Sequence, residues 1–324
     1  NTEPFLMPVE AGDTTSQAVL ELRKRLGGFE TEHGRLNGLS YQAKADEVFV
    51  VTSPKCGTTW VQQIVHQLRS RGSMDFEEIS VPVPWIEMAH DLGQDLNADQ
   101  GYTPRAFKTH CWYDHCPKGA KYIVVVRDPH DVAVSFFSFF QGWFFEPGEV
   151  SIDEFVQGFW LARGTPESNM QNASYFHHLL SWWEHRHDPN VLFLFYEDLK
   201  DDLAMHVTQI ARLMELDDVE ERSKIAVQHA TFEFMSLHSQ HFDERHSKLA
   251  RNAACSLPPD AGLKNGKVRE GKSGAGRPAL SAGLAAAIDT KWTDVVGQAT
   301  GCNTYVQLRQ LAAHERQSLH KDNR

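Results

Sequence analysis

The sequence is short of cysteine, of long apolar runs and of positive charge, and each shortage excludes a class of protein. Its 324 residues include only five cysteines (Cys56, Cys111, Cys116, Cys255 and Cys302), which are too few, and odd in number, for a disulfide scaffold. We therefore expect a reducing compartment and a cytoplasmic protein. No apolar run reaches the roughly 18 residues of a membrane-spanning helix, so we expect no membrane partner.

The charge balance is acidic, with 43 Asp and Glu against 32 Lys and Arg and a formal net charge of −11. No basic stripe offsets this balance, so we expect no nucleic-acid partner. A phosphate site stays compatible with an acidic chain, because backbone amides and a few local cations are enough to form one.

Apolar residues make up 41% of the chain, which is enough for a sizeable core. Segments 47–52, 122–126 and 191–195 are rich in β-branched or aromatic residues and read as buried strands. Helical patterns follow them from residues 58, 131 and 201. Strands that alternate with helices predict a single α/β domain, with a central parallel sheet flanked by helices on both faces.

The chain divides by composition into a main domain and two flanking parts. Residues 1–46 read as a polar lead-in packed on the domain, with one helix over 16–26, and residues 47–312 form the domain itself. Within it, 244–276 is rich in Gly, Lys, Asn, Ser and Pro and is predicted as a long loop. A helical pattern returns over 278–312, and residues 313–324 are predicted as a flexible polar tail.

The turn after the first strand carries the residues of an anion site. Lys55, Gly57, Thr58 and Thr59 stand where a helix begins, and helix N-termini present unpaired N–H groups and a positive dipole end. The lysine comes two positions before the glycine, so this P-loop-like turn is not the G-x-x-x-x-G-K-[ST] loop of ordinary NTP hydrolases. The alternative is a plain strand-to-helix turn in which these side chains act as caps.

Residues 54–60 read Pro-Lys-Cys-Gly-Thr-Thr-Trp. This segment resembles the 5′-phosphosulfate loop of the cytosolic-type sulfotransferases, whose usual form is Pro-Lys-Ser-Gly-Thr-Thr-Trp. The chain departs from the family at Cys56. A thiol is a weaker hydrogen-bond donor than a hydroxyl, so we expect the backbone amide of Cys56 to matter more than its side chain.

Two further segments match the family in the same order along the chain. Residues 125–135 resemble its 3′-phosphate motif, in which Arg127 and Ser135 match the residues that hold that phosphate. Residues 107–110, Phe-Lys-Thr-His, resemble the segment that supplies the catalytic base. The resemblance makes His110 the general base and places Lys108 beside it, where it steadies charge on the transferring group.

The remaining matches concern the nucleoside and the closing loop. Residues 194–200 resemble a strand-end motif that places Tyr196 near the adenine, and 231–235 resemble the adenine-contacting segment. Residues 268–274 resemble the family's Arg-Lys-Gly-x-x-Gly loop, which closes over the 3′-phosphate, although Glu270 replaces the usual lysine. The family's short dimerisation motif should start near Arg277, and its Thr-Val and final Glu are missing, so the chain is expected to be a monomer or a dimer of another kind.

Together the resemblance implies a sulfotransferase domain over 47–312 with the segment 244–276 closing over the cofactor. It implies in-line transfer of a sulfuryl group from 3′-phosphoadenosine 5′-phosphosulfate (PAPS), with adenosine 3′,5′-bisphosphate (PAP) as product and no metal. The catalytic residues would be His110, Lys55 and Lys108, with Lys55 stabilising the leaving phosphate. The cofactor-binding residues would be Lys55, Cys56, Gly57, Thr58, Thr59, Trp60, Arg127, Ser135, Tyr196, Thr231, Phe232, Met235, Arg269, Glu270 and Gly271.

The acceptor is expected to be a small molecule. The aromatic run 136–145 offers an apolar lining, and 83–87 resembles a family segment near the acceptor entrance. A phenol, an alcohol and an amine all remain open. Two other functions also remain: a nucleotide kinase with an atypical phosphate loop, which predicts magnesium dependence, and a non-catalytic nucleotide-binding protein, which predicts a missing base. The cluster His110-Cys111 and His115-Cys116 fits no standard zinc spacing.

Overall fold

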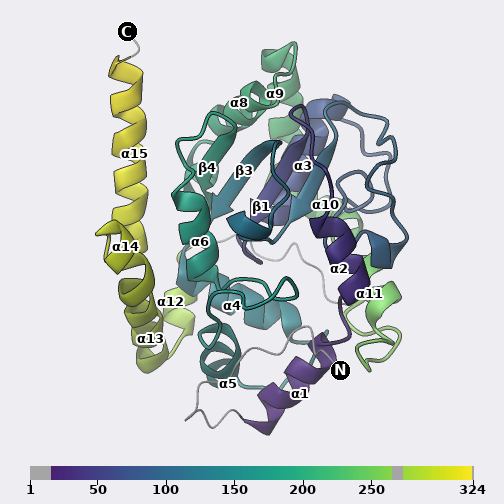
Figure 1. Cartoon of the computed structure of the whole chain (residues 1–324), viewed down its shortest axis with the longest axis vertical. Coiled ribbons are helices and arrows are strands. Elements are labelled where there is room, and N and C mark those ends of the chain that lie inside the picture. Colours follow the sequence, from purple (N-terminus) through teal and green to yellow (C-terminus); the bar gives the residue numbers. More distant parts are fainter. Residues whose placement is uncertain (1–15, 265–272, 323–324) are drawn as a thin grey trace.

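A four-stranded parallel sheet forms the centre of the molecule (Figure 1). The computed structural model of the chain describes residues 16–264 and 273–322. The strands are β1 (Val48–Thr52), β2 (Ala106–Thr109), β3 (Lys121–Val126) and β4 (Val191–Phe195), in the order β2-β1-β3-β4. All neighbouring pairs are parallel, which confirms the predicted fold class.

Both faces of the sheet are buried, as a parallel sheet requires. Successive residues of β1 point to opposite sides, so Val48 and Val50 join one core cluster while Phe49 and Val51 join the other. Helices α3 (Thr58–Ser70), α8 (Leu203–Leu213) and α9 (Val219–His229) contribute to the first cluster. Helices α4 (Pro129–Phe140), α6 (Tyr175–Trp183) and α13 (Ala282–Trp292) contribute to the second (Figure 1).

The remaining elements surround this centre. They are α1 (Gln17–Leu26), α2 (Glu32–Leu39), α5 (Ile152–Phe155), α7 (Tyr196–Asp201), α10 (Phe232–Leu237), α11 (Arg245–Arg251), α12 (Gly276–Ala279), α14 (Gln298–Thr300) and α15 (Tyr305–Asp322), with short 3-10 turns at His90–Leu92, Tyr113–His115 and Ser239–His241 and π turns at Val156–Trp160 and Thr293–Gly297. In the part of the chain that the structure describes, none of these helices is both long and apolar enough to pass through a bilayer.

The predicted strands 47–52, 122–126 and 191–195 and the predicted helix 16–26 are observed, with bounds within a residue of those expected. Strand β2 was not expected as a strand, because Ala-Phe-Lys-Thr is short and half polar. It forms because its backbone pairs with β1 along its whole length. The helix expected from residue 201 is observed as α8, which begins at Leu203 with Asp202 as its cap, and the short helix α7 directly after β4 was not expected.

Two segments are more ordered than their composition predicted. The predicted loop 244–276 contains helix α11, and its residues 265–272 lie outside the described residues. Residues 313–322, which were predicted as part of a polar tail, continue helix α15. Ion pairs from Glu315 to Arg186 at 2.9 Å and from Arg316 to Asp198 at 2.9 Å attach this helix to the domain.

The sheet positions the site through its carboxyl-terminal edge. In parallel strands these ends meet at one edge, so the turns after β1, β3 and β4 and the residue after β2 lie together. Lys55, Arg127, Tyr196 and His110 stand in these four places.

Candidate active site

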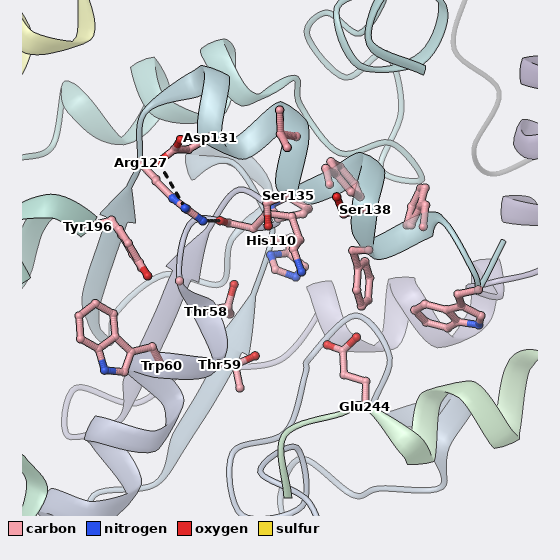
Figure 2. A pocket seen from close by; sticks show the side chains of 18 of the residues that line it. Thr58, Thr59, Trp60, His110, Arg127, Asp131, Ser135, Ser138, Tyr196 and Glu244 are labelled. Atoms are coloured by element: carbon pink, nitrogen blue, oxygen red, sulfur yellow. Dashed lines mark hydrogen bonds and ion pairs between the residues drawn. The ribbon is translucent and has the colours of Figure 1, made fainter. Parts of the chain in front are cut away.

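A cavity of about 1100 Å³ opens at this edge of the sheet and collects most of the residues predicted for the site. Figure 2 shows side chains from α3, α4, α7 and the end of β2 directed toward it. Twelve predicted residues line it: Lys55, Gly57, Thr58, Thr59, Trp60, His110, Arg127, Ser135, Tyr196, Thr231, Phe232 and Met235. Lys108 and Cys56 are not part of its wall, and Arg269, Glu270 and Gly271 lie outside the described residues.

The turn between β1 and α3 has a backbone that few residues adopt. Lys55 has φ +74° and Gly57, the N-cap of α3, has φ +103°. A Cβ atom at Gly57 would lie 2.8 Å from Cδ2 of Tyr196, so only glycine fits between the two turns. The hydroxyl of Thr58 lies 2.6 Å from that of Thr52, which fixes the first turn of α3 on the end of β1.

Arg127 joins the turn after β3 to the turn after β1. Its Nη1 donates to the carbonyl of Lys55 at 3.4 Å, and its guanidinium carbon lies 4.5 Å from the centre of the Tyr196 ring. Tyr175 donates to the carbonyl of Arg127 at 2.6 Å and holds the backbone from the other side. The two turns that the sequence assigned to the two phosphates are therefore adjacent (Figure 2).

Asp131 also belongs to this group, although the sequence analysis did not name it. One carboxylate oxygen accepts from Arg127 Nη2 at 3.3 Å and from the backbone N–H of Gly274 at 2.9 Å, and the other accepts from Gly276 N–H at 2.7 Å. A Cβ atom at Gly276 would lie 2.4 Å from the backbone of α4. Asp131 thus attaches the segment from 273 onward to the first turn of α4. Its position four residues after Arg127 is a spacing at which an ion pair forms in a helix, and this was the only hint of its role in the sequence.

His110 lies at the end of β2 with its ring packed edge-on against Trp85, at a centroid distance of 5.0 Å. Its Nδ1 is 2.8 Å from the carbonyl oxygen of Thr52, and its backbone N–H donates to Glu87 Oε1 at 2.7 Å. A carbonyl oxygen only accepts hydrogen bonds, so the neutral ring carries its proton on Nδ1 and its lone pair on Nε2. This tautomer is the one that a general base on a cavity wall requires.

Lys108 was expected beside His110 at the reacting centre, and the structure buries it against the ring of Trp85, which His110 also contacts. Its ammonium forms a buried ion pair with Glu244 at 2.8 Å and lies 4.2 Å from the Trp85 ring, and the residue is only 2% exposed. Glu244, not Lys108, faces the cavity. Glu244 is 136 positions away in the sequence, so no local pattern pointed to this pair.

Lys55 and Cys56 have opposite environments. The ammonium of Lys55 lies on the cavity wall, 4.0 Å from the centre of the Phe139 ring. The thiol of Cys56 is fully buried, and burial raises its pKa to about 12, although Arg127 opposes the shift. The Cys56 N–H donates to the carbonyl of Ser53 at 3.3 Å within the turn, so neither polar group of Cys56 forms the wall.

The residues assigned to the adenine form a separate group around Trp60. Trp60 packs edge-on against Tyr196 at 5.2 Å, and its indole N–H donates to the carbonyl of Ala230 at 2.7 Å. That bond fixes the segment Thr231–Met235, where Thr231 caps α10 and Phe232 stays 48% exposed. An exposed ring beside a fixed indole offers stacking surfaces for a planar base.

The other end of the cavity is aromatic. Helix α4 and the turn after it contribute Phe136, Phe139, Phe140, Trp143 and Phe144 from the run predicted to line an acceptor site. Three rings from elsewhere complete the wall: Phe29, Trp85 and Phe159. Polar side chains stand among them at Ser138, which lies within the predicted run, and at Glu30, Arg163 and Asn172, which the sequence did not indicate.

The described residues contain no group of three or more His, Cys, Asp or Glu side chains arranged to hold a metal ion. The cysteines next to His110 and His115 are buried, and burial raises the pKa of both the Cys111 and the Cys116 thiols. Buried thiols of this kind are poor ligands and poor nucleophiles.

Comparison with known families gives one match over most of the chain. The family described as "Sulfotransferase domain" matches residues 45–286, which include both phosphate turns and His110. Sulfotransferase 1E1 of Homo sapiens is 32% identical over 227 residues, which is 64% of this chain and 75% of that protein. The protein named amine sulfotransferase of Oryctolagus cuniculus is 31% identical over 200 residues, 60% of this chain and 64% of that protein.

Solved structures share the fold. Mouse sulfotransferase SULT7A1, solved in complex with PAP, aligns with a TM-score of 0.59 and 25% identity over 82% of this chain and 90% of that chain. Retinol dehydratase, solved with androsterone and the inactive cofactor PAP, aligns with a TM-score of 0.62 and 21% identity over 90% of this chain and 96% of that chain.

Proposed function

Since the chain belongs to the sulfotransferase domain family, we propose that it transfers the sulfuryl group of PAPS to a hydroxyl or amine of a small acceptor. One observation carries the proposal. A single cavity joins the turn of Lys55 and Gly57, the guanidinium of Arg127 and the ring of His110, and it continues into an aromatic end with room for an acceptor.

The donor fits the nucleotide end of the cavity. The start of α3, with glycine at the N-cap, offers backbone N–H groups and a positive helix end to the 5′-phosphosulfate. Arg127 and Ser135 lie on the wall nearby and supply a planar cation and a hydroxyl for the 3′-phosphate. The relative SULT7A1 was solved with PAP, which supports the same nucleotide here.

Sulfuryl transfer leaves little covalent chemistry to the protein, so its residues act by position and charge. His110 takes the proton of the acceptor on Nε2, while the carbonyl of Thr52 holds Nδ1–H and stabilises the imidazolium that forms. Lys55 neutralises the charge that develops on the leaving 5′-phosphate, and Thr58 and Thr59 orient it from the first turn of α3.

Lys108 acts, in this proposal, by exchanging partners. Its ammonium is held by Glu244, and Glu244 forms part of the cavity wall. When PAPS binds, its sulfuryl oxygens lie near the carboxylate of Glu244. The ammonium of Lys108 can then leave Glu244 and bind these oxygens instead. The loop residues Arg269, Glu270 and Gly271 are proposed to close over the 3′-phosphate, since Asp131 fixes the backbone that follows them.

We also propose that the protein is cytoplasmic and that it does not form the dimer built on the family's short dimerisation motif. All five cysteines are free and buried, which suits a reducing compartment. Arg277, where the dimer motif would start, forms an ion pair with Asp289 of α13 at 2.7 Å.

A labelling experiment separates this function from its two rivals. The protein is incubated with PAPS carrying ³⁵S, a panel of phenols, alcohols and amines, and excess chelator. Transfer of ³⁵S that survives the chelator supports the sulfotransferase. Magnesium-dependent transfer of the γ-phosphate of ATP replaces it with a kinase, and tight PAP binding without transfer to any acceptor favours a nucleotide-binding protein.

A further inference from the structure

The aromatic end of the cavity finishes in a buried polar group that the reaction itself does not use. Arg163, after the π turn Val156–Trp160, and Asn172, shortly before α6, both line the cavity there. Arg163 is 8% exposed and Asn172 is 9% exposed, so both are buried residues that still contribute to the cavity wall. Glu30 lines the cavity beside them.

Arg163 is a buried cation with an incomplete set of partners. Its Nη2 donates to the backbone carbonyl of Asn172 at 3.1 Å, and no carboxylate of the described residues forms an ion pair with it. Burial lowers the pKa of Arg163 to about 10, with repulsion from Arg35 adding to the effect and Glu30 opposing it. A buried charge without a counterion is costly, and a charged ligand would offset that cost.

The nearest carboxylate is already committed to another arginine. Glu30 Oε2 accepts from Arg35 Nη1 at 2.7 Å, and the side chains of both residues are buried. Arg35 pairs with Glu30 and also lies near the buried carboxylate of Glu87, so its charge is compensated on both sides. Arg163 is the guanidinium on the cavity wall and has no ion pair of its own among the described residues, so the complementary ligand group is an anion.

Asn172 is oriented to assist such a group. Its Oδ1 accepts from Arg35 Nη2 at 2.8 Å, and because a guanidinium only donates, the atom facing Arg35 must be the amide oxygen. The Nδ2 donors of Asn172 are thereby turned away from Arg35. Arg35 Nε donates to the carbonyl of Asn169 at 2.5 Å, so the whole arrangement is fixed before any ligand arrives.

Aromatic rings separate this polar end from His110. The ring of Trp85 lies 5.0 Å from that of His110, and the ring of Phe29, next to Glu30, lies 5.8 Å from Trp85. Phe29 is itself packed edge-on against Trp143 and Phe144. The wall between base and guanidinium is therefore aromatic and apolar, which suits a flat aromatic body.

We propose that the acceptor is an aromatic hydroxy acid, which places its hydroxyl at His110 and its carboxylate on Arg163 and Asn172. The inference rests on the proposed function for the hydroxyl end, and on the buried, built site at Arg163 for the carboxylate end. A planar guanidinium binds a carboxylate through two parallel hydrogen bonds, which distinguishes it from a neutral carbonyl.

Two probes of equal shape test the carboxylate end. 6-Hydroxy-2-naphthoate and 6-hydroxy-2-naphthamide have the same two fused rings and hydroxyl, and they differ only at the far end, where the first carries an anionic carboxylate and the second a neutral amide. Titration calorimetry measures the affinity of each for the full chain, with and without PAP. A charged hydrogen bond of this kind corresponds to a preference of about 10-fold to 100-fold for the carboxylate. Equal affinity, a preference for the amide, or no binding of either probe overturns the inference.

Variants of Arg163 test whether its side chain causes the preference for the carboxylate probe over the amide probe. Arg163→Met keeps length and apolar volume, and we expect it to bring the carboxylate-to-amide ratio close to one. Arg163→Lys keeps a charge without the planar fork and is expected to retain part of the ratio. Arg212→Met, at an exposed position of α8, is the matched control and keeps the full ratio. A full ratio in Arg163→Met would overturn the assignment even if the preference itself is real.

The experiments distinguish failure of the carboxylate site from failure of the proposed sulfotransferase activity. If ³⁵S is transferred from PAPS to neutral phenols but the two naphthalene probes bind equally, the sulfotransferase stands and the carboxylate site fails. If the protein prefers the carboxylate probe, and loses this preference in Arg163→Met, but transfers no ³⁵S from PAPS, the carboxylate site is supported and the sulfotransferase proposal is wrong.

Discussion

Nδ1 of His110 lies 2.8 Å from the carbonyl oxygen of Thr52, the last residue of β1. Strand β1, which ends at the turn of Lys55 and Gly57, thus also fixes the tautomer of His110, because its final carbonyl accepts the only proton of the neutral ring. The bond joins two neighbouring parallel strands at their carboxyl ends, and both the proposed anion site and the proposed base lie at that edge.

Replacing the proposed base, His110, should separate catalysis from binding. We expect His110→Ala to lower kcat by about 10²-fold to 10⁴-fold, the usual contribution of a general base, while the Kd for PAP changes little. Steady-state transfer of ³⁵S and calorimetry with PAP measure the two quantities. A large loss of PAP affinity with normal kcat would assign His110 to the nucleotide instead.

The opposite pattern is expected at Arg127. Removal of a charged hydrogen bond by Arg127→Ala should weaken PAP binding by about 1.5–3 kcal/mol, or roughly 10-fold to 100-fold. Calorimetry with PAP checks the change, and Arg212→Ala on the exposed surface of α8 serves as the control. Unchanged PAP affinity in Arg127→Ala would remove Arg127 from the 3′-phosphate site.

Gly57 should tolerate no side chain. A Cβ atom there would lie 2.8 Å from the Tyr196 ring at a φ of +103°, so Gly57→Ala displaces either the turn or the ring. We expect a loss of about 1–3 kcal/mol in the free energy of unfolding, together with weaker PAP binding. Urea unfolding followed by tryptophan fluorescence measures the first effect. Gly283→Ala is the control, since that position has open space and an ordinary φ, and it should be neutral or stabilising. An equally mild effect at Gly57 would mean that the two turns are not held this closely.

The buried pair of Lys108 and Glu244 should show strong coupling. Lys108→Met or Glu244→Gln alone leaves one buried charge without its partner and is expected to cost about 3–5 kcal/mol of stability. The double variant removes both charges and should cost less than the sum of the two. Urea unfolding of the wild type, both single variants and the double variant gives this coupling directly, and additive losses would contradict the pair.

Acid should destabilise the fold partly through His66. This residue is buried against the rings of Phe76 and Tyr102, and burial lowers its pKa from 6.5 to about 3, with repulsion from Arg69 adding to the effect. Because the folded pKa lies below the unfolded one, the contribution is complete above pH 6.5 and is lost as the pH falls toward 3.

Each such group lowers the free energy of unfolding by about 1.4 kcal/mol per pH unit within that window. We expect His66→Leu to reduce the slope between pH 6 and pH 4 by about this amount, whereas the exposed variant His314→Gln keeps the wild-type slope. Urea unfolding at a series of pH values measures it. An unchanged slope in His66→Leu would show that His66 is protonated in the folded protein.

The sequence predicted the sheet and the turns that line the cavity at its carboxyl edge because both depend on local patterns. The runs 47–52, 122–126 and 191–195 are apolar enough to be strands in any context, and each ends at a turn with polar residues of a recognisable kind. β2 lacks such a run, and its pairing with β1 comes from backbone contacts across the sheet. It was therefore missed as a strand, although His110 at its end was identified through the resemblance.

Contacts between distant segments account for what the sequence did not predict. Glu244 reaches Lys108 across 136 positions, and Asp131 binds the backbone of Gly274 and Gly276 across more than 140. The helix over 313–322 has a polar composition that suggests a loose tail, and it is held by ion pairs to residues of other elements.

The central claim is that one nucleotide spans the turn at Gly57 and the guanidinium of Arg127, with its transferring end toward His110. A crystal structure of the chain with PAP tests this claim most directly. The account predicts the 5′-phosphate at the first turn of α3, the 3′-phosphate within hydrogen-bond distance of Arg127 and Ser135, and the adenine beside Trp60. PAP bound elsewhere, or bound with its phosphates reversed between the two turns, would contradict it.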